Sequence, residues 1–216
     1  MQRQIHLLSE EKVEVLFSRF AKQNPQPTTE LKYTTPFELF VAVVLSAQAT
    51  DKKVNEVTGR LFKIANTPEA FLELGEARLS ELIYPLSFYR TKAKNLIAAC
   101  KIIVEEYQGN LPTARDELLK LPGVGRKTAN VLANTLYEEE VYGVDTHVFR
   151  VSNRTGLAPG KTPEAVEKLL QTRVPMPYRR HAHHWLVLHG RYTCTARKPK
   201  CQLCMINDLC EYPTKH

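Results

Sequence analysis

A glycine-rich segment from Leu121 to Ala129 carries the lysine best placed for covalent chemistry in this sequence. It reads LPGVGRKTA. We expect a helix over about 115–120 to stop at Pro122, which cannot continue the hydrogen-bond ladder, and a new helix to begin near Arg126. In the first turn of that helix the positive end of the dipole disfavours a charged amine, and we expect partial burial to act in the same direction, which would make Lys127 a candidate nucleophile. Taken alone, a lysine in this position more often contacts a phosphate.

The same segment predicts a phosphate-binding turn. Gly123 and Gly125 allow left-handed backbone angles and, with Val124 between them, present bare amide groups. A helix N-terminus with free N–H groups binds phosphate, and Arg126 adds positive charge directly after the glycines. Residues of about 115–137 therefore form a helix-hairpin-helix pattern, which contacts a DNA backbone without reading bases. The alternative is a plain corner between two helices.

Asp145 is the carboxylate that could assist such a lysine. It lies in the segment Gly143–Arg150 (GVDTHVFR), before an apolar run, where we expect it to cap the N-terminus of a helix. A capping role alone would explain the residue. A capping carboxylate is also held rigidly and kept ionised, so the cap and a role in catalysis are compatible.

Four of the five cysteines lie near the C-terminus with the spacing C-x6-C-x2-C-x5-C. This spacing suits a zinc ion or an iron–sulfur cluster about equally well. The N-terminal residues contain no long apolar segment typical of a signal peptide, so we expect a reducing, intracellular environment and a metal site rather than disulfides. The fifth cysteine, Cys100, is expected in a helical core. The four proposed ligands are Cys194, Cys201, Cys204 and Cys210.

Lys and Arg number 30 and Asp and Glu 23, a net charge of +7 that favours a polyanionic partner. The segment 173–200 has no acidic residue and combines basic, histidine and aromatic residues, which favours a nucleic-acid surface over a merely solvated basic face. No apolar run is long enough to span a membrane. The basic residues are Arg173, Arg179, Arg180, Arg191, Arg197, Lys198 and Lys200, and the others are His181, His183, His184, His189, Tyr178, Trp185 and Tyr192.

Apolar residues recur with helical spacing along most of the chain. The pattern predicts helices from Phe37 to about Ala49, across Leu96–Tyr107 and across Trp185–Tyr192. Alternating strand patterns of useful length are absent, and glycine and proline separate the helical stretches. With 43% hydrophobic and 25% charged residues, the composition is that of a globular protein. We therefore predict an all-α fold.

Together these motifs resemble, in the same order, those of the bacterial endonuclease III family of DNA glycosylases and AP lyases. The matching residues are 45–51, 121–131, 144–150 and 183–194, together with the cysteine spacing, which in that family holds a 4Fe–4S cluster. The resemblance implies two helical lobes with a DNA-binding cleft between them. One is a six-helix barrel at residues 29–139, and the other is discontinuous, at 1–28 and 140–216, with the cluster loop at 194–210.

The resemblance also implies an activity and site roles. The enzyme would remove oxidised or ring-saturated pyrimidines and cut 3′ of the abasic site by β-elimination through a lysine Schiff base. Lys127 would be the nucleophile and Asp145 its assisting carboxylate, while Gln48 and Phe88 would fill the gap left by the extruded nucleotide. We expect a monomer in the bacterial cytoplasm, associated with the nucleoid, with one 4Fe–4S cluster and no nucleotide cofactor. The remaining expected DNA contacts are Gly123, Val124, Gly125, Arg126, Arg191, Lys198 and Lys200.

One segment departs from the family pattern. Relatives usually have glycine where this chain has Ser87, and Pro85 is also unusual. Serine restricts the turn, so Phe88 could instead be an aromatic packed beside Tyr89.

Two other functions share part of the pattern. An adenine-specific mismatch glycosylase has the hairpin, the aspartate and the cluster, but it lacks a nucleophilic lysine at the position of Lys127 and carries a further C-terminal domain. A non-catalytic helix-hairpin-helix module would not need Lys127 and Asp145 together.

Overall fold

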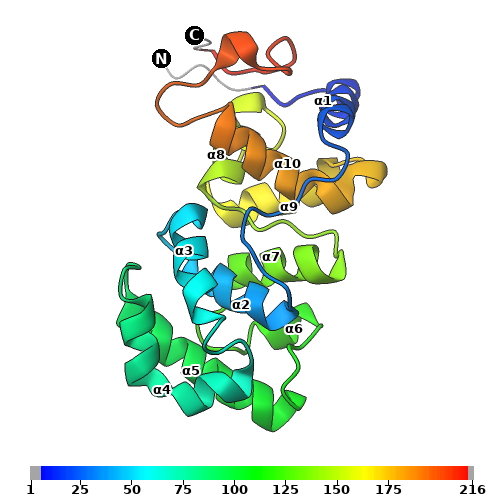
Figure 1. Ribbon diagram of the computed structural model, residues 1–216. Coiled ribbons are helices and arrows are strands. Elements are labelled where there is room, and N and C mark those ends of the chain that lie inside the picture. The colour runs from blue at the N-terminus through cyan, green and yellow to red at the C-terminus, as the bar shows by residue number, and fades with distance from the viewer. Residues whose placement is uncertain (1–5, 214–216) are drawn as a thin grey trace. The chain divides into compact units, whose positions relative to one another are not determined.

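The computed structural model describes residues 6–213, which form ten α-helices, two short 3-10 helices and no strand in that range (Figure 1). The predicted all-α fold is confirmed. The chain divides into two units, one of Thr29–Tyr137 and one of Met1–Thr28 with Glu138–His216. Each unit has its own apolar core. None of the helices in the described range has the length and hydropathy needed to cross a bilayer.

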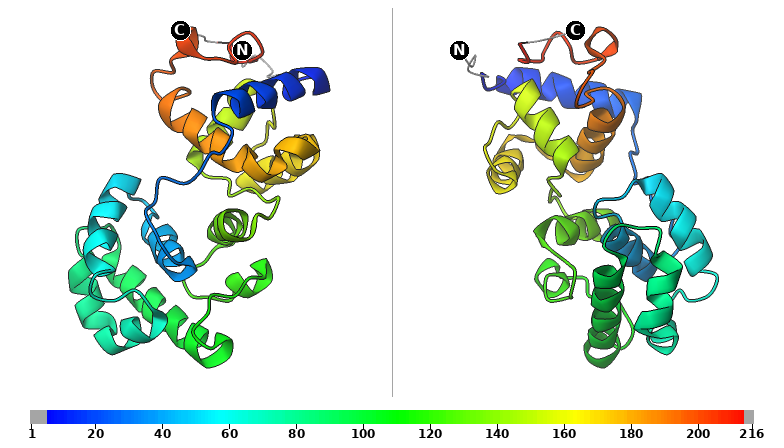
Figure 2. Two further views of the ribbon diagram at one scale, coloured as in Figure 1. Left: turned by 45° about the vertical axis from the view of Figure 1, so that its right-hand side comes forward. Right: turned by 90° about the vertical axis from the view of Figure 1, so that its left-hand side faces the viewer.

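The Thr29–Tyr137 unit is built around one buried helix. Residues 37–45 of α2 are all buried, and this helix packs against α3, α5 and α7 (Figure 2). The long helices α4 and α5 lie side by side. The helices of the unit are α2 (Pro36–Leu45), α3 (Asp51–Leu61), α4 (Pro68–Ile83), α5 (Tyr89–Tyr107), α6 (Arg115–Leu118) and α7 (Arg126–Tyr137).

Local sequence explains where these helices start. The hydroxyls of Thr35, Thr50 and Thr67 each accept a backbone N–H of the following helix. Proline follows two of these caps, at the first helical position, where its missing N–H costs nothing. Cys100 lies fully buried in the core, as expected, and burial raises the pKa of its thiol to about 12.

The predicted end of the first helix near Ala49 is wrong, because α2 ends at Leu45. The hydroxyl of Ser46 donates to the Val43 carbonyl at 2.7 Å and so competes with the helical pattern. Two residues later Gln48 adopts a left-handed backbone angle, with φ of 54°. The segment 46–49 is therefore a turn between α2 and α3.

The second unit is assembled from both ends of the chain (Figures 1 and 2). Its α10 packs against α8, and the indole N–H of Trp185 donates to the Asn24 carbonyl at 2.8 Å, which joins α10 to the end of α1. The backbone N–H of Leu8 donates to the Gly156 carbonyl at 2.9 Å. The helices are α1 (Glu10–Gln23), α8 (Thr146–Thr155), α9 (Pro163–Arg173) and α10 (Arg179–Tyr192), with 3-10 turns at Met176–Tyr178 and Cys201–Leu203.

Candidate active site and cysteine loop

The hairpin between α6 and α7 is a pair of tight turns. The backbone N–H of Leu121 donates to the Leu118 carbonyl at 3.2 Å, and that of Val124 donates to the Leu121 carbonyl at 3.0 Å. Val124 is buried and anchors the hairpin in the core, while Gly123 is left-handed with φ of 84°. A Cβ at Gly123 would lie 3.1 Å from the Cβ of Asn95 on α5, so both backbone angle and space require glycine.

Of the two glycines that allow a left-handed angle, only Gly123 adopts one, and Gly125 does not. Its carbonyl accepts the N–H of Ala129 at 2.9 Å, so Gly125 already takes part in the first turn of α7, which needs no left-handed residue. A Cβ at this position would meet nothing within 4 Å. What Gly125 provides is an exposed backbone at the start of a helix, open to close approach by a phosphate.

Lys127 lies in the first turn of α7, as predicted. Its side chain is exposed, so the burial considered from the sequence is absent. It takes part in no salt bridge among the residues that the structure describes. Lys120 differs, since its ammonium lies 2.8 Å from the Glu117 carboxylate, which raises the pKa of Lys120. The Lys127 amine is therefore available for reaction, whereas the Lys120 amine is held in an ion pair.

Asp145 caps α8, which confirms the structural part of its prediction. One carboxylate oxygen accepts the backbone N–H of His147 at 2.8 Å and that of Val148 at 2.9 Å. The other lies 3.1 Å from Nδ1 of the His147 ring. The carboxylate is thus held at the positive end of a helix dipole, which favours its ionised form.

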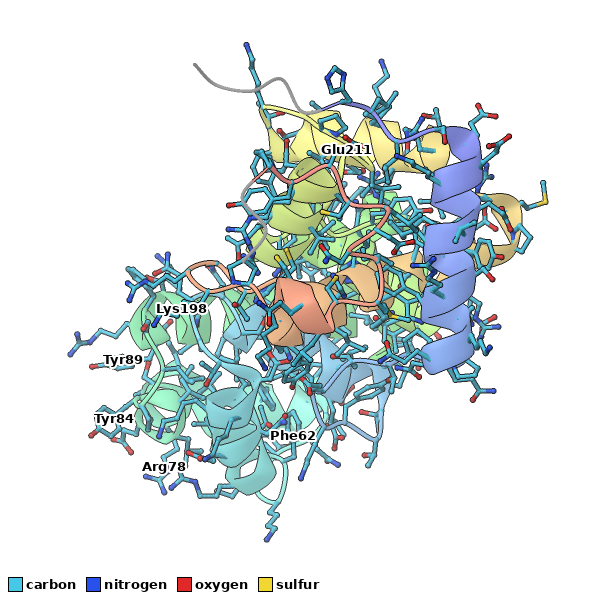
Figure 3. The ribbon with its side chains drawn as sticks, turned by 90° about the horizontal axis from the view of Figure 1, so that it is seen from above. Phe62, Arg78, Tyr84, Tyr89, Lys198 and Glu211 are labelled. Atoms are coloured by element: carbon cyan, nitrogen blue, oxygen red, sulfur yellow. The ribbon has the colours of Figure 1, made fainter. Side chains whose placement is uncertain are left out.

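Gln48 and Phe88 share an unusual backbone conformation. Both are left-handed, with φ of 54° and 56°, and both are exposed, Phe88 at 63%. The interpretation of Phe88 as a packed aromatic is wrong. The ring of Tyr89 packs instead edge-on against Tyr84, with ring centroids 6.3 Å apart (both are labelled in Figure 3). The Arg90 guanidinium carbon lies 4.8 Å from the centroid of the Tyr89 ring.

The four C-terminal cysteines line one cavity, together with Arg154 and His189. Hydrogen-bonding groups surround the sulfurs: an Arg154 nitrogen lies 3.6 Å from Sγ of Cys194, His189 Nε2 lies 3.6 Å from Sγ of Cys204, and the Tyr212 N–H donates to Sγ of Cys210 at 3.4 Å. In the described part of the chain, no three His, Cys, Asp or Glu side chains converge closely enough for one metal ion. Four cysteine side chains that line one cavity, with hydrogen-bonding groups beside three of the sulfurs, fit a cluster held by four cysteines.

Sequence reasoning missed the two arginines that organise this loop. On α8, Arg150 donates to the carbonyls of Cys194 at 2.9 Å and Gly190 at 2.7 Å. One turn later, Arg154 donates to the carbonyls of Thr195 at 2.7 Å and Ala196 at 2.8 Å. Their i, i+4 spacing on the helix that Asp145 caps was the available signal.

The prediction that the whole basic segment forms a nucleic-acid surface is wrong for its buried histidines and tryptophan and for the arginines that bond within their own unit. His183, His184, Trp185 and His189 are buried, because they lie on the inner face of α10. Arg173 and Arg179 donate to the carbonyls of Leu157 at 2.8 Å and Val174 at 3.0 Å, and Arg180 pairs with Glu138. Arg191 is partly buried, while Arg197, Lys198 and Lys200 are exposed on the cysteine loop (Figure 3 labels Lys198).

Comparison with known proteins agrees with this geometry. Residues 41–176 match the HhH-GPD superfamily of base excision DNA repair proteins, and residues 194–210 match the iron-sulfur binding domain of endonuclease III. Endonuclease III of Escherichia coli (strain K12) is 52% identical over 200 residues, which cover 93% of this chain and 95% of that protein. The chain belongs to the endonuclease III family. As a family member it is a base-excision repair DNA glycosylase and AP lyase, and its cysteine loop is an iron–sulfur site rather than a zinc site.

Other members of the endonuclease III family are equally similar. The protein of Rickettsia conorii is 53% identical over 200 residues, with 93% of this chain and 95% of that protein covered. A solved structure of a trapped endonuclease III–DNA covalent intermediate, in an estranged-adenine complex, superimposes with a TM-score of 0.88 at 40% identity. A non-covalent endonuclease III–DNA complex gives 0.89 at 40% identity. Each structure covers 94% of this chain and 96% of its own.

Proposed function

We propose that this enzyme removes oxidised or ring-saturated pyrimidines from double-stranded DNA and then cleaves the strand 3′ of the abasic site. The observation that carries the proposal is the exposed amine of Lys127, which follows the hairpin directly and is engaged in no salt bridge within the described residues. An amine held in the first turn of a helix, next to groups suited to a phosphate, is placed to react with the adjoining sugar.

Lys127 acts as the nucleophile in this proposal. Its Nζ forms a bond to C1′ of the deoxyribose as the glycosidic bond breaks, and the base leaves with the bonding electron pair and takes up a proton. Asp145 stabilises the positive charge that develops on the sugar. The bound amine loses a proton, the C1′–O4′ bond breaks, and O4′ takes up a proton, which opens the sugar ring and leaves a protonated Schiff base at C1′. That Schiff base acidifies the C2′ proton, and loss of that proton expels the 3′ phosphate and cuts the strand.

DNA binding is assigned to backbone contacts and to two inserted side chains. The amides of 123–125 and Arg126 bind phosphate at the start of α7. Gln48 and Phe88 fill the gap that an extruded nucleotide leaves in the duplex, since a flipped base must be replaced in the stack. Arg191, Lys198 and Lys200 add backbone contacts from the iron–sulfur unit.

A 4Fe–4S cluster would fix the conformation of the loop that carries Lys198 and Lys200. Its ligands would be Cys194, Cys201, Cys204 and Cys210. Arg150 and Arg154 hold the backbone of the same loop from α8. We assign the enzyme to the cytoplasm, as a monomer on chromosomal DNA.

Duplexes with one defined lesion test the proposed function. The enzyme should nick a duplex that contains a single ring-saturated pyrimidine or an abasic site, and leave an unsaturated aldehyde on the 3′ end. A duplex with adenine opposite an oxidised guanine serves as the contrasting substrate. Release of adenine from that duplex without nicking would instead identify an adenine-specific mismatch glycosylase, and binding without any cleavage would identify a non-catalytic module.

A further inference from the structure

Lys92 is a buried lysine on α5, only 6% exposed. Its ammonium donates to the carbonyl of Leu45 at 2.9 Å and to that of Ala47 at 2.7 Å. Burial lowers the pKa of Lys92. A buried amine is costly unless it is well hydrogen-bonded, so this lysine calls for an explanation beyond packing.

The two carbonyls belong to the turn that presents Gln48. Leu45 is the last residue of α2, and Ala47 directly precedes the left-handed Gln48. A left-handed angle at a residue with a side chain costs energy, and it persists only where the surroundings impose it. By fixing the peptide planes on the approach to Gln48, the Lys92 ammonium imposes that turn and leaves the Gln48 side chain exposed.

Lys92 also lies one helical turn after the second left-handed residue, so its side chain ties the start of α5 to the turn of Gln48. Its backbone N–H donates to the carbonyl of Phe88 at 3.0 Å, in the first turn of α5. Phe88 has no side-chain cap that would fix the start of α5 in another way. One residue therefore bonds both turns, through its side chain on one and its main chain on the other.

We propose that Lys92 is a positioning residue that holds Gln48 and Phe88 in register as the pair filling the gap left by an extruded nucleotide. The proposal rests on the proposed function, because it assumes that these two side chains enter the DNA. Lys92 itself touches neither the DNA nor the reacting sugar. Its effect is therefore confined to duplex DNA, where the side chains of Gln48 and Phe88 must fill the gap in the base stack.

The test compares borohydride trapping on two abasic substrates, one in duplex and one in single-stranded DNA. A single strand has no gap to fill, so it needs Lys127 but not the inserted pair. Lys92→Met, close in length but without donors, should reduce the trapping rate on duplex about tenfold or more and leave the single-strand rate close to wild type. Lys94→Met, at an exposed position on the same helix, is the matched control and should affect neither.

The outcomes separate the two proposals. No trapping by the wild type on either substrate contradicts the proposed function, and this inference falls with it. Normal wild-type trapping with an equal loss on both substrates in Lys92→Met, or with no loss on duplex, overturns the role of Lys92 alone.

A second variant and a double-mutant comparison guard against misfolding. Lys92→Gln keeps an N–H donor in a shorter side chain, and it should show the same duplex-specific loss to a smaller degree. In a Gln48→Ala, Phe88→Ala background, Lys92→Met should cause little further loss on duplex. A loss of the full size in that background would contradict action through those two residues.

Discussion

The carboxylate of Asp145 holds His147 at two points, accepting its backbone N–H at 2.8 Å and lying 3.1 Å from its ring Nδ1. The backbone contact caps α8 and the ring contact fixes the second oxygen. The charge is therefore oriented before any substrate arrives. A pre-oriented charge stabilises a developing cation without reorganising during the reaction.

Asp145→Asn should separate the cap from the charge. Asparagine keeps an oxygen for the N–H groups of His147 and Val148, so the midpoint of thermal unfolding should stay near that of the wild type. Base release, measured in single-turnover experiments, should slow by about 10²–10³ while DNA binding persists. Asp145→Ala is the comparison, since it also removes the cap and should cost about 1 kcal/mol of stability. An unchanged rate in Asp145→Asn would exclude an electrostatic role.

Lys127→Gln should abolish both borohydride trapping and strand cleavage. The hairpin amides and Arg126 remain, so affinity for undamaged duplex should change little. Lys120→Gln is the matched control, because Lys120 is paired with Glu117 and should tolerate the change. Trapping that survives in Lys127→Gln and disappears in Lys120→Gln would show that Lys120 is the nucleophile.

The cysteine loop should contain iron and acid-labile sulfide at about four per chain, and the purified protein should be yellow-brown. Removal of the iron should weaken DNA binding, because Lys198 and Lys200 lose their fixed loop. Cys100→Ala should keep the visible absorbance, since Cys100 lies in the core of the other unit. Stoichiometric zinc in a colourless protein, after anaerobic preparation, would rule out the cluster.

Affinity for undamaged duplex should fall steeply with salt, at a log–log slope of about −0.9 for each phosphate neutralised. Lys198→Ala and Lys200→Ala should each flatten that slope by about one unit. Arg179→Ala should lower stability and leave the slope unchanged, because Arg179 donates to the Val174 carbonyl inside its own unit. Equal slopes for wild type and both lysine variants would mean that the lysines only face solvent.

Acid should destabilise the protein through His184. Burial, with a smaller contribution from His181, lowers the pKa of His184 to about 4. Its contribution to stability is therefore complete above the unfolded pKa of about 6.5 and is lost as the pH falls towards 4. Replacing it in His184→Gln should flatten the curve of unfolding free energy over that window by on the order of 3 kcal/mol. Urea unfolding at several pH values would measure this, and parallel curves would refute it.

The parts of the site that local sequence determines were predictable. A helix had to stop near Pro122 and restart at Arg126, and Asp145 before an apolar run had to be a cap. The Lys92 ammonium and the Ala47 carbonyl are 45 positions apart in the sequence, so the helical spacing of apolar residues could not predict their contact. Arg150 is likewise 44 positions from the Cys194 carbonyl that it holds.

The burial of the α10 histidines could not be predicted from the sequence for a different reason. Composition placed His183, His184 and His189 on a basic surface, although the structure buries all three. A neutral imidazole packs in a core as readily as it faces a polyanion, and the packing of α10 against α8 and of His189 against Phe20 of α1 distinguishes the two. Residue type alone could not decide this.

The closure of the discontinuous unit by residues from both chain ends sets an order of assembly during synthesis. Helix α1 leaves the ribosome before the other helices of its unit, yet Trp185, whose indole donates to the Asn24 carbonyl after α1, is made about 160 residues later. The Thr29–Tyr137 unit is complete by then and can fold in the meantime. The apolar face of α1 must therefore wait, uncovered, until the helices of residues 146–192 have been made. A chain that stops before Cys194 would carry Lys127 and the hairpin but none of the four cysteines that line the cavity of the loop.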